Sequence, residues 1–190
     1  SSYRSNPLGL AEFTLSRKDP EYVGRAKVIQ KAEKARIVDE SPIDAVNELG
    51  PIFTSIKEVF TDVNNKNTGI GSTIYAVKPG DGSAREQAAS CQKVLGGWAN
   101  IAKEYATKRY RSNLINWGML PFVLKEDTCF DNGDYLFIPN IIEAVKEKKT
   151  SIKAYVVNKS MKEFELKLGE LTDDEREIIL KGCLINYYKA

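Results

Sequence analysis

The chain has 190 residues, of which 42% are hydrophobic and 28% are charged, which suits one well-buried core and is short for two. Its 28 basic and 26 acidic residues leave a formal net charge of +2, which disfavours a nucleic-acid footprint or a polybasic membrane patch. No apolar run reaches the length of a membrane span and no signal-peptide pattern opens the chain, so we expect a cytoplasmic protein. Because Ser1 rather than methionine comes first, we also expect a fragment of a larger chain.

Helices are predicted over the first third of the chain. An N-cap residue followed by proline opens a helix over 20–36. Ser41 and Pro42 repeat this start signal for a second helix, which should end at Gly50–Pro51, and further helical turns follow over 53–60. We interpret residues 1–60 as a helical N-terminal excursion.

Strands and helices alternate in the rest of the chain. The β-branched and aromatic run over 72–77 is bounded by glycines and predicts a buried strand. The elements after it are, in order, a helix from 83 to Gly96–Gly97, a short strand from Trp98, a helix over 107–117, strands near 120–124 and 135–138, a helix near 140–148, strands near 151–157 and 162–168, and a last helix opened by the capping box Thr172–Glu175. This alternation predicts one α/β domain with its core over 70–190.

The side chains available for chemistry are restricted. Histidine is absent, which removes Ser–His catalysis, histidine-ligated zinc and the commonest general base. Cys91, Cys129 and Cys183 are far apart and form neither a C-x-x-C pair nor a disulfide framework, so we interpret them as buried hydrophobes and predict no metal site in this chain. Any chemistry must use hydroxyl, carboxylate, guanidinium or amine groups.

The turn GDGSARE, residues 80–86, joins a predicted strand to a predicted helix. Its glycines allow a ligand to approach the backbone closely, and the first helical turn offers unpaired N–H groups and the positive end of the helix dipole. Arg85 adds a planar fork that suits a carboxylate or phosphate. The same field would lower the pKa of the Ser83 hydroxyl, which would let it act as a base.

A structural role for the same residues competes with the catalytic one. Ser83 and Glu86 have the spacing of a capping box, in which each side chain accepts a backbone N–H of the other. Spacing by itself favours this cap over a catalytic serine.

Two blocks of sequence resemble one known family. The run GDGSAREQAASCQKVLGG resembles the G-[ED]-G-S-S-R-E-H-A-A…L-G-G segment of the swivelling domain in the aconitase superfamily, and RYRSNLINWGMLPF, residues 109–122, is similar to the second block of that domain. The segment around Arg4 resembles an upstream arginine segment of the same family. The resemblance implies an aconitase-type swivelling β/β/α domain with additional N-terminal helices.

The resemblance also implies a function, that of a hydro-lyase acting on a hydroxy di- or tricarboxylic acid. Ser83 matches the base that removes a proton alpha to a carboxylate, Arg85 and Arg4 match arginines that bind carboxylate, and Gly82 and Ala84 belong to the substrate-binding loop. In the family a 4Fe–4S cluster accepts the departing hydroxyl as a Lewis acid. The cysteines here do not match its ligands, so we expect the cluster on preceding domains of the same chain or on a separate large subunit, and no activity from this chain alone.

The sequence departs from the family pattern at two positions. Ala84 stands where the family has a second serine, and Gln87 stands where it has a histidine. These differences indicate a divergent branch and leave the substrate open.

Two other functions remain open at this stage. One is a freestanding small subunit of the isopropylmalate-isomerase type. The other is a non-catalytic module that binds anions or RNA through Lys108–Arg111, although we favour a solvated helix face there and expect no nucleic acid and no membrane partner. Trp98, Trp117 and the pair Tyr187–Tyr188 are predicted to pack in the core.

Overall fold

The computed structural model describes residues 20–80, 85–182 and 188. Its helices are α2 (Pro20–Ile37), α3 (Pro42–Ala45), α4 (Leu49–Val59), α5 (Arg85–Val94), α6 (Lys108–Asn116), α7 (Ile141–Lys146) and α8 (Asp173–Leu180). Its strands are β1 (Ser72–Ala76), β2 (Gly97–Ala102), β3 (Leu120–Val123), β4 (Leu136–Phe137), β5 (Ser151–Val156) and β6 (Lys162–Leu168). Within these residues, no helix is both long enough and apolar enough to span a bilayer.

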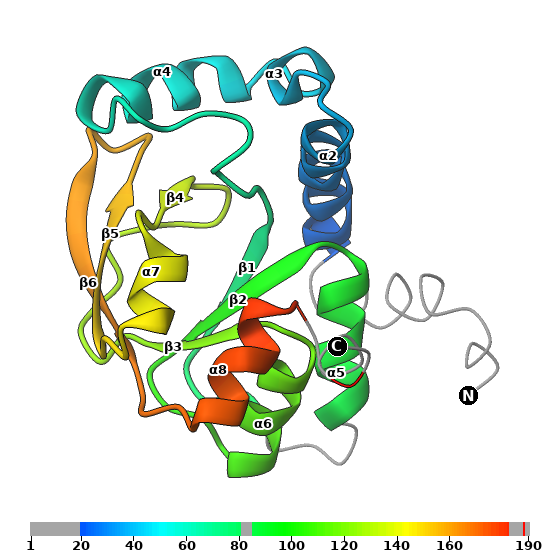
Figure 1. The fold of residues 1–190 in the computed structure, drawn as a ribbon, viewed down its shortest axis with the longest axis vertical. Helices are drawn as coiled ribbons and strands as arrows, with labels where there is room; N and C mark the ends of the chain where they lie inside the picture. Colours follow the sequence, from blue (N-terminus) through cyan, green and yellow to red (C-terminus); the bar gives the residue numbers. More distant parts are fainter. Residues whose placement is uncertain (1–19, 81–84, 183–187, 189–190) are drawn as a thin grey trace, which may run out of the picture.

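The strands form one mixed sheet in the order β1-β2-β3-β6-β5-β4. β1, β2 and β3 are parallel and are joined through α5 and α6, as parallel neighbours require a crossover connection. β6, β5 and β4 continue the sheet with antiparallel pairing. α5 packs against α6, and α6 against α8, beside the parallel half of the sheet (Figure 1). The expected α/β class is therefore confirmed.

The main core lies between the sheet and α7. Its largest fully buried members include Phe122 on β3 and Leu166 and Leu168 on β6. The two leucines alternate with exposed residues along β6, as strand geometry requires. Ala144 and Val145 of α7 join the same cluster. This apolar layer therefore extends across both the parallel and the antiparallel half of the sheet.

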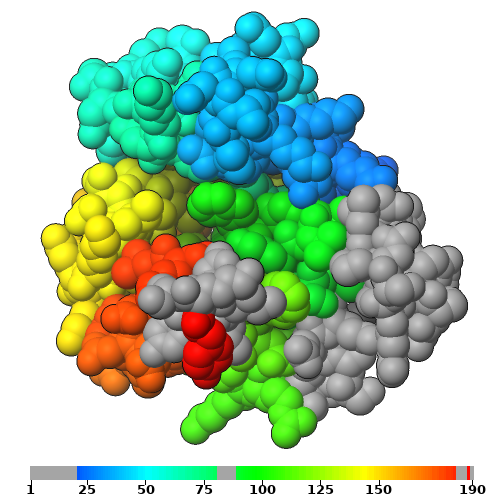
Figure 2. All heavy atoms as spheres, turned by 45° about the vertical axis from the view of Figure 1, so that its right-hand side comes forward, coloured from blue at the N-terminus to red at the C-terminus, as the bar shows by residue number. Residues whose placement is uncertain are grey.

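The N-terminal helices form a separate layer across one end of the molecule (Figures 1 and 2). The predicted helix over 20–36 is confirmed as α2, and Ser41 caps α3 by accepting a hydrogen bond from the Asp44 N–H. The predicted stop at Gly50–Pro51 is wrong, since α3 ends at Ala45 and α4 runs through both residues. Pro51 is tolerated because it occupies the first turn of α4, where the missing N–H would have no helical acceptor.

β1 corrects a second expectation, because it is only partly buried. It lies at an edge of the sheet and pairs with β2 on one side only. A β-branched and aromatic composition predicts a strand but does not distinguish an edge strand from a central one. The later elements lie where they were predicted, including the capping box between Thr172 and Glu175 that opens α8.

A buried carboxylate ties α2 to the segment that leads into β1. Glu33 is 8% exposed and accepts hydrogen bonds from the Arg36 Nε at 2.5 Å and from the Ile70 N–H at 2.6 Å. Arg36 also donates to the backbone carbonyl of Asn65 at 3.3 Å. The N-terminal layer is therefore held by a hydrogen-bonded charge pair as well as by apolar packing.

We predict that Glu33→Ala lowers the free energy of unfolding by about 2–4 kcal/mol, because it removes the carboxylate that pairs with a poorly exposed guanidinium and accepts a backbone N–H. Glu21→Ala on the same helix is the matched control, since Glu21 forms an i,i+4 pair with Arg25 at 3.1 Å while its side chain is 87% exposed. The control should cost at most about 0.5 kcal/mol. Urea unfolding followed by circular dichroism measures both, and equal losses would show that Glu33 contributes no more than a surface pair.

Candidate functional site

The candidate loop connects β1 to α5. Gly82, Ser83 and Ala84 lie outside the described residues, as does Arg4. Arg85 is placed as the first residue of α5, and its side chain is not among those described. The roles expected for these five residues therefore remain predictions, and the site is built from the residues that hold the loop.

The described start of the loop is bound to the segment that follows β2. The Glu104 N–H donates to the Val77 carbonyl at 3.2 Å, and the Ala106 N–H donates to the Pro79 carbonyl at 2.9 Å. Since β1 and β2 are parallel, both segments leave the sheet at the same end, where the carboxyl ends of these strands lie. The carboxyl ends of parallel strands are where open α/β sheets place their ligands.

Gly80 is held tightly by the first turn of α6. Its φ of +96° lies in the left-handed region, and a Cβ added there would come within 2.4 Å of the Tyr110 Cβ. The Thr107 hydroxyl donates to the Gly80 carbonyl at 3.3 Å and accepts the Tyr110 N–H at 3.1 Å, which also caps α6. A side chain at residue 80 would meet both a backbone penalty and a steric one.

A buried polar cluster lies beneath this contact, and we call Gln92, Asn100 and Tyr110 the amide–tyrosine cluster. Gln92 Nε2 on α5 and Asn100 Nδ2 on β2 donate to the Tyr110 hydroxyl at 3.0 and 2.7 Å. All three residues are at most 5% exposed, and burial raises the pKa of the Tyr110 phenol, which keeps it neutral. Within the part of the chain that the structure describes, Gln92 Oε1 and Asn100 Oδ1 have no hydrogen-bond partner.

The sequence analysis did not identify this cluster. An asparagine inside the otherwise apolar run WANIA of β2 was the available signal, because a polar side chain in a central strand needs a buried partner. Its partners come from α5 and α6, and their distance from Asn100 follows from the packing of these helices and not from residue spacing. Tyr105 adds a second, half-buried phenol, which donates to the Phe122 carbonyl at 2.8 Å.

The basic segment over 108–111 does not form the patch that an RNA-binding module would need. Tyr110, the interleaved aromatic, is buried and unavailable for stacking on a base. Arg111 turns towards α8, where it donates to the Glu170 carbonyl at 3.1 Å and pairs with Glu175 at 3.5 Å. The segment is a helix start whose middle residue belongs to the core.

The described residues include no group of three or more histidine, cysteine, aspartate or glutamate side chains that would hold a metal ion. Cys91 is buried among Tyr22, Val23 and Leu95, as expected of a small hydrophobe, and Cys129 is half-buried. Cys183 lies outside the residues described. An iron–sulfur cluster therefore has no fitting set of ligands in the described part of the chain.

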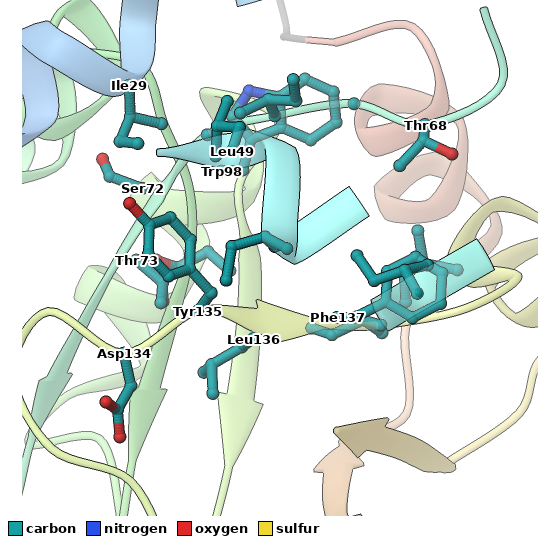
Figure 3. A pocket seen from close by; sticks show the side chains of 18 of the residues that line it. Ile29, Leu49, Thr68, Ser72, Thr73, Trp98, Asp134, Tyr135, Leu136 and Phe137 are labelled. Carbon is teal, nitrogen blue, oxygen red and sulfur yellow. The ribbon is translucent and has the colours of Figure 1, made fainter. Parts of the chain in front are cut away.

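A hollow of about 1470 Å³ separates the N-terminal layer from the sheet. Figure 3 shows its lining, in which Ile29, Leu49 and Phe137 are apolar and Ser72 and Thr73 come from the start of β1. The described loop residues 77–80 do not line it. The hollow is therefore a separate feature from the candidate loop.

Two of the aromatic residues predicted to pack in the core are exposed instead. Trp98, on the wall of the hollow, is 42% exposed, and its ring lies so close to Gly69 that a Cβ there would come within 2.4 Å of it. Tyr188 is 78% exposed, and Tyr187 lies outside the described residues. Trp117 does pack against the cluster around Tyr110, as predicted.

Comparison with known proteins places this loop in a family segment. Residues 57–127 match the aconitase C-terminal domain, a stretch that contains β1, the candidate loop, α5, β2, α6 and β3. The matched part of the chain belongs to this family, so the resemblance drawn from the two sequence blocks is confirmed.

Three relatives show the range of the match. The chain is 29% identical over 150 residues to aconitate hydratase A of Rickettsia bellii, covering 75% of this chain and 16% of the relative. It is 36% identical over 110 residues to the methanogen homoaconitase small subunit of Methanocaldococcus jannaschii, covering 58% and 56%. It is 33% identical over 111 residues to the 3-isopropylmalate dehydratase small subunit 1 of Archaeoglobus fulgidus, covering 58% and 61%. The chain thus spans less than two thirds of each of these curated relatives.

One solved structure also resembles the chain. The crystal structure of a 3-isopropylmalate dehydratase from Methanocaldococcus jannaschii is 30% identical and covers 73% of this chain and 77% of its own, with a TM-score of 0.47. The aconitase-type fold rests on the family match over residues 57–127 and on the observed α/β architecture.

We predict that Gly80→Ala lowers the free energy of unfolding by about 2–5 kcal/mol, from the left-handed backbone together with overpacking against Tyr110. Gly133→Ala is the matched control, because Gly133 has a φ of +86° and no atom within 4 Å of an added Cβ. The control should cost only the backbone part, about 1–2 kcal/mol. Thermal unfolding of both variants tests this prediction. An equal loss of stability in the two variants would mean that Tyr110 moves aside for the added Cβ without destabilising the fold.

Proposed function

We propose that this chain is the substrate-carboxylate-binding swivelling domain of an aconitase-like hydro-lyase that acts on a hydroxy di- or tricarboxylic acid. The observation that carries the proposal is the place of the loop. It leaves the carboxyl end of a parallel strand, leads into the start of α5, and lies within the residues matched by the family. The relatives named as hydratases and dehydratases support the same reaction class.

The proposed chemistry uses the start of α5 as an anion site. Its first backbone N–H groups have no helical acceptor, and the helix dipole favours negative charge there. In the proposal Arg85 and Arg4 bind substrate carboxylates, Gly82 permits close approach of the backbone, and Ala84 contributes no hydroxyl. Ser83 removes the proton alpha to a carboxylate, and the same electrostatic field stabilises its alkoxide.

Departure of the substrate hydroxyl requires an electrophile from elsewhere. The resemblance implies a 4Fe–4S cluster, and the described residues hold no ligand set for one. In this proposal the cluster belongs to other domains of the same chain or to a separate large subunit. Residues 1–190 then form one domain, with its core over 70–190, and the isolated chain is inactive.

Whether the chain is a domain or a subunit is a separate choice, because both kinds of relative match it. Immunoblotting of the source cells with an antibody against this chain distinguishes the two. A band several times larger supports one domain of a single-chain hydratase. A band of this size supports a small subunit, and then an iron–sulfur protein should be recovered with it on pull-down.

We predict that Ser83→Ala abolishes turnover in the complete enzyme, by about 10³-fold or more, while substrate affinity and the unfolding midpoint change little. The physical reason is that the change deletes the proposed base and leaves the carboxylate site intact. Ser55→Ala on α4, at the other end of the molecule in Figure 1, is the control and should retain full turnover. Normal turnover in Ser83→Ala would reduce Ser83 to a helix cap.

We predict that Arg85→Lys raises KM about 10- to 100-fold, because lysine cannot reproduce the two parallel N–H bonds of a guanidinium to a carboxylate. Arg25→Lys is its control, since Arg25 forms an exposed pair with Glu21 on α2. Steady-state kinetics of both variants provide the measurement. An unchanged KM for Arg85→Lys would exclude a bidentate carboxylate contact at residue 85.

A further inference from the structure

Tyr110 lies between the two ends of the candidate loop. Its Cβ and ring face Gly80, the last described residue at the start of the loop, at distances that leave no room for a Cβ. Its hydroxyl accepts a hydrogen bond from Gln92 on α5, the helix that follows the loop. One side chain therefore contacts the residue that enters the loop and the helix that leaves it.

Thr107, the N-cap residue of α6, makes a second contact with Gly80. The Thr107 hydroxyl donates to the Gly80 carbonyl and accepts the Tyr110 N–H, so the cap of α6 is also a clamp on the loop. Asn100 fixes the same phenol from the sheet side at 2.7 Å. Tyr110, on α6, therefore links the loop after β1 to β2 and to α5.

The amide–tyrosine cluster would be an unfavourable choice of side chains if its only role were to fill the core. Two buried amide oxygens, on Gln92 and Asn100, find no hydrogen-bond donor in residues 20–80, 85–182 and 188, and an unsatisfied buried acceptor opposes folding. Apolar side chains of similar volume would fill the same space without that penalty. A directional hydrogen bond does what apolar packing does not, because it sets the position of one element relative to another.

We propose that Tyr110 is a positioning residue for the loop at 80–85, holding Gly80 with its ring and α5, through Gln92, with its hydroxyl. The inference rests on the proposed function, in which the start of α5 and Ser83 must be placed together against a substrate carboxylate. A shift of about 1 Å in such a constellation is enough to lower activity about 100-fold.

The first experiment is hydrogen exchange of the backbone amides over 77–90 in Tyr110→Phe. This substitution keeps the ring against Gly80 and removes the acceptor shared by Gln92 and Asn100. We expect exchange in this segment to become about tenfold faster, the loss expected for one buried hydrogen bond. The matched control is Tyr135→Phe, which removes the hydroxyl that hydrogen-bonds Glu48 and should leave residues 77–90 unchanged.

A second variant guards against general unfolding. Gln92→Leu removes the link to α5 together with the unpaired amide oxygen, so it should retain the fold and still accelerate exchange over 77–90. Unchanged exchange in both Tyr110→Phe and Gln92→Leu would overturn the inference. Equal acceleration in Tyr135→Phe would overturn it as well, because the effect would then be general.

The second readout is the binding of citrate to the same folded variants, followed by amide chemical shifts. We expect citrate affinity to fall about tenfold in Tyr110→Phe and to stay at the wild-type value in Tyr135→Phe. A loosened loop with unchanged affinity would leave Tyr110 a structural role only and overturn the positioning one. Absence of carboxylate binding by the wild type, with citrate, malate and isopropylmalate alike, would instead overturn the proposed function, while the exchange result would still report on the hold of Tyr110.

Discussion

The contact of α6 with the end of β1 is the constraint on which the candidate site depends. A glycine in the left-handed region lies against Tyr110, and the threonine that caps α6 donates to the carbonyl of that glycine. The loop after β1 therefore starts from a point set by the next helix but one, and not by β1 alone. Because β1 and β2 are parallel, their carboxyl ends lie at the same end of the sheet.

The amide–tyrosine cluster links β2, α5 and α6, and it also contains groups that oppose folding. The phenol accepts hydrogen bonds from α5 and from β2, while two amide oxygens have no partner among the described residues. Buried polar groups with incomplete hydrogen bonding are disfavoured in a core that serves packing alone. Gln92, Asn100 and Tyr110 all lie within residues 57–127, the segment that matches the aconitase C-terminal domain, and Tyr110 contacts the described start of the candidate loop at Gly80.

The N-terminal layer is a different kind of feature. It is tied to the sheet through Glu33 and Ile70 and leaves a largely apolar hollow beside the start of β1. The candidate loop leaves the carboxyl end of β1, and β1 lines the hollow as far as Tyr75, whereas the described loop residues 77–80 do not line it.

The order and type of most elements follow from sequence, because caps, glycine stops and hydrophobic periodicity are local signals. Examples are the capping box at Thr172, the left-handed Gly118 that follows α6, and the change from the strand β1 to the helix α5. The helix end predicted at Gly50–Pro51 is wrong, because proline breaks a helix in its interior but is tolerated in the first turn, where Pro51 lies.

Only the tertiary structure decided that β1 is an edge strand, that Tyr110 is a core residue within a basic segment, and that Gln92 and Asn100 meet at its hydroxyl. These facts depend on which strands are neighbours and on how α5 packs against α6. The spacing of residues along the chain does not contain that information, because contacts between elements far apart in sequence arise only when the sheet is assembled.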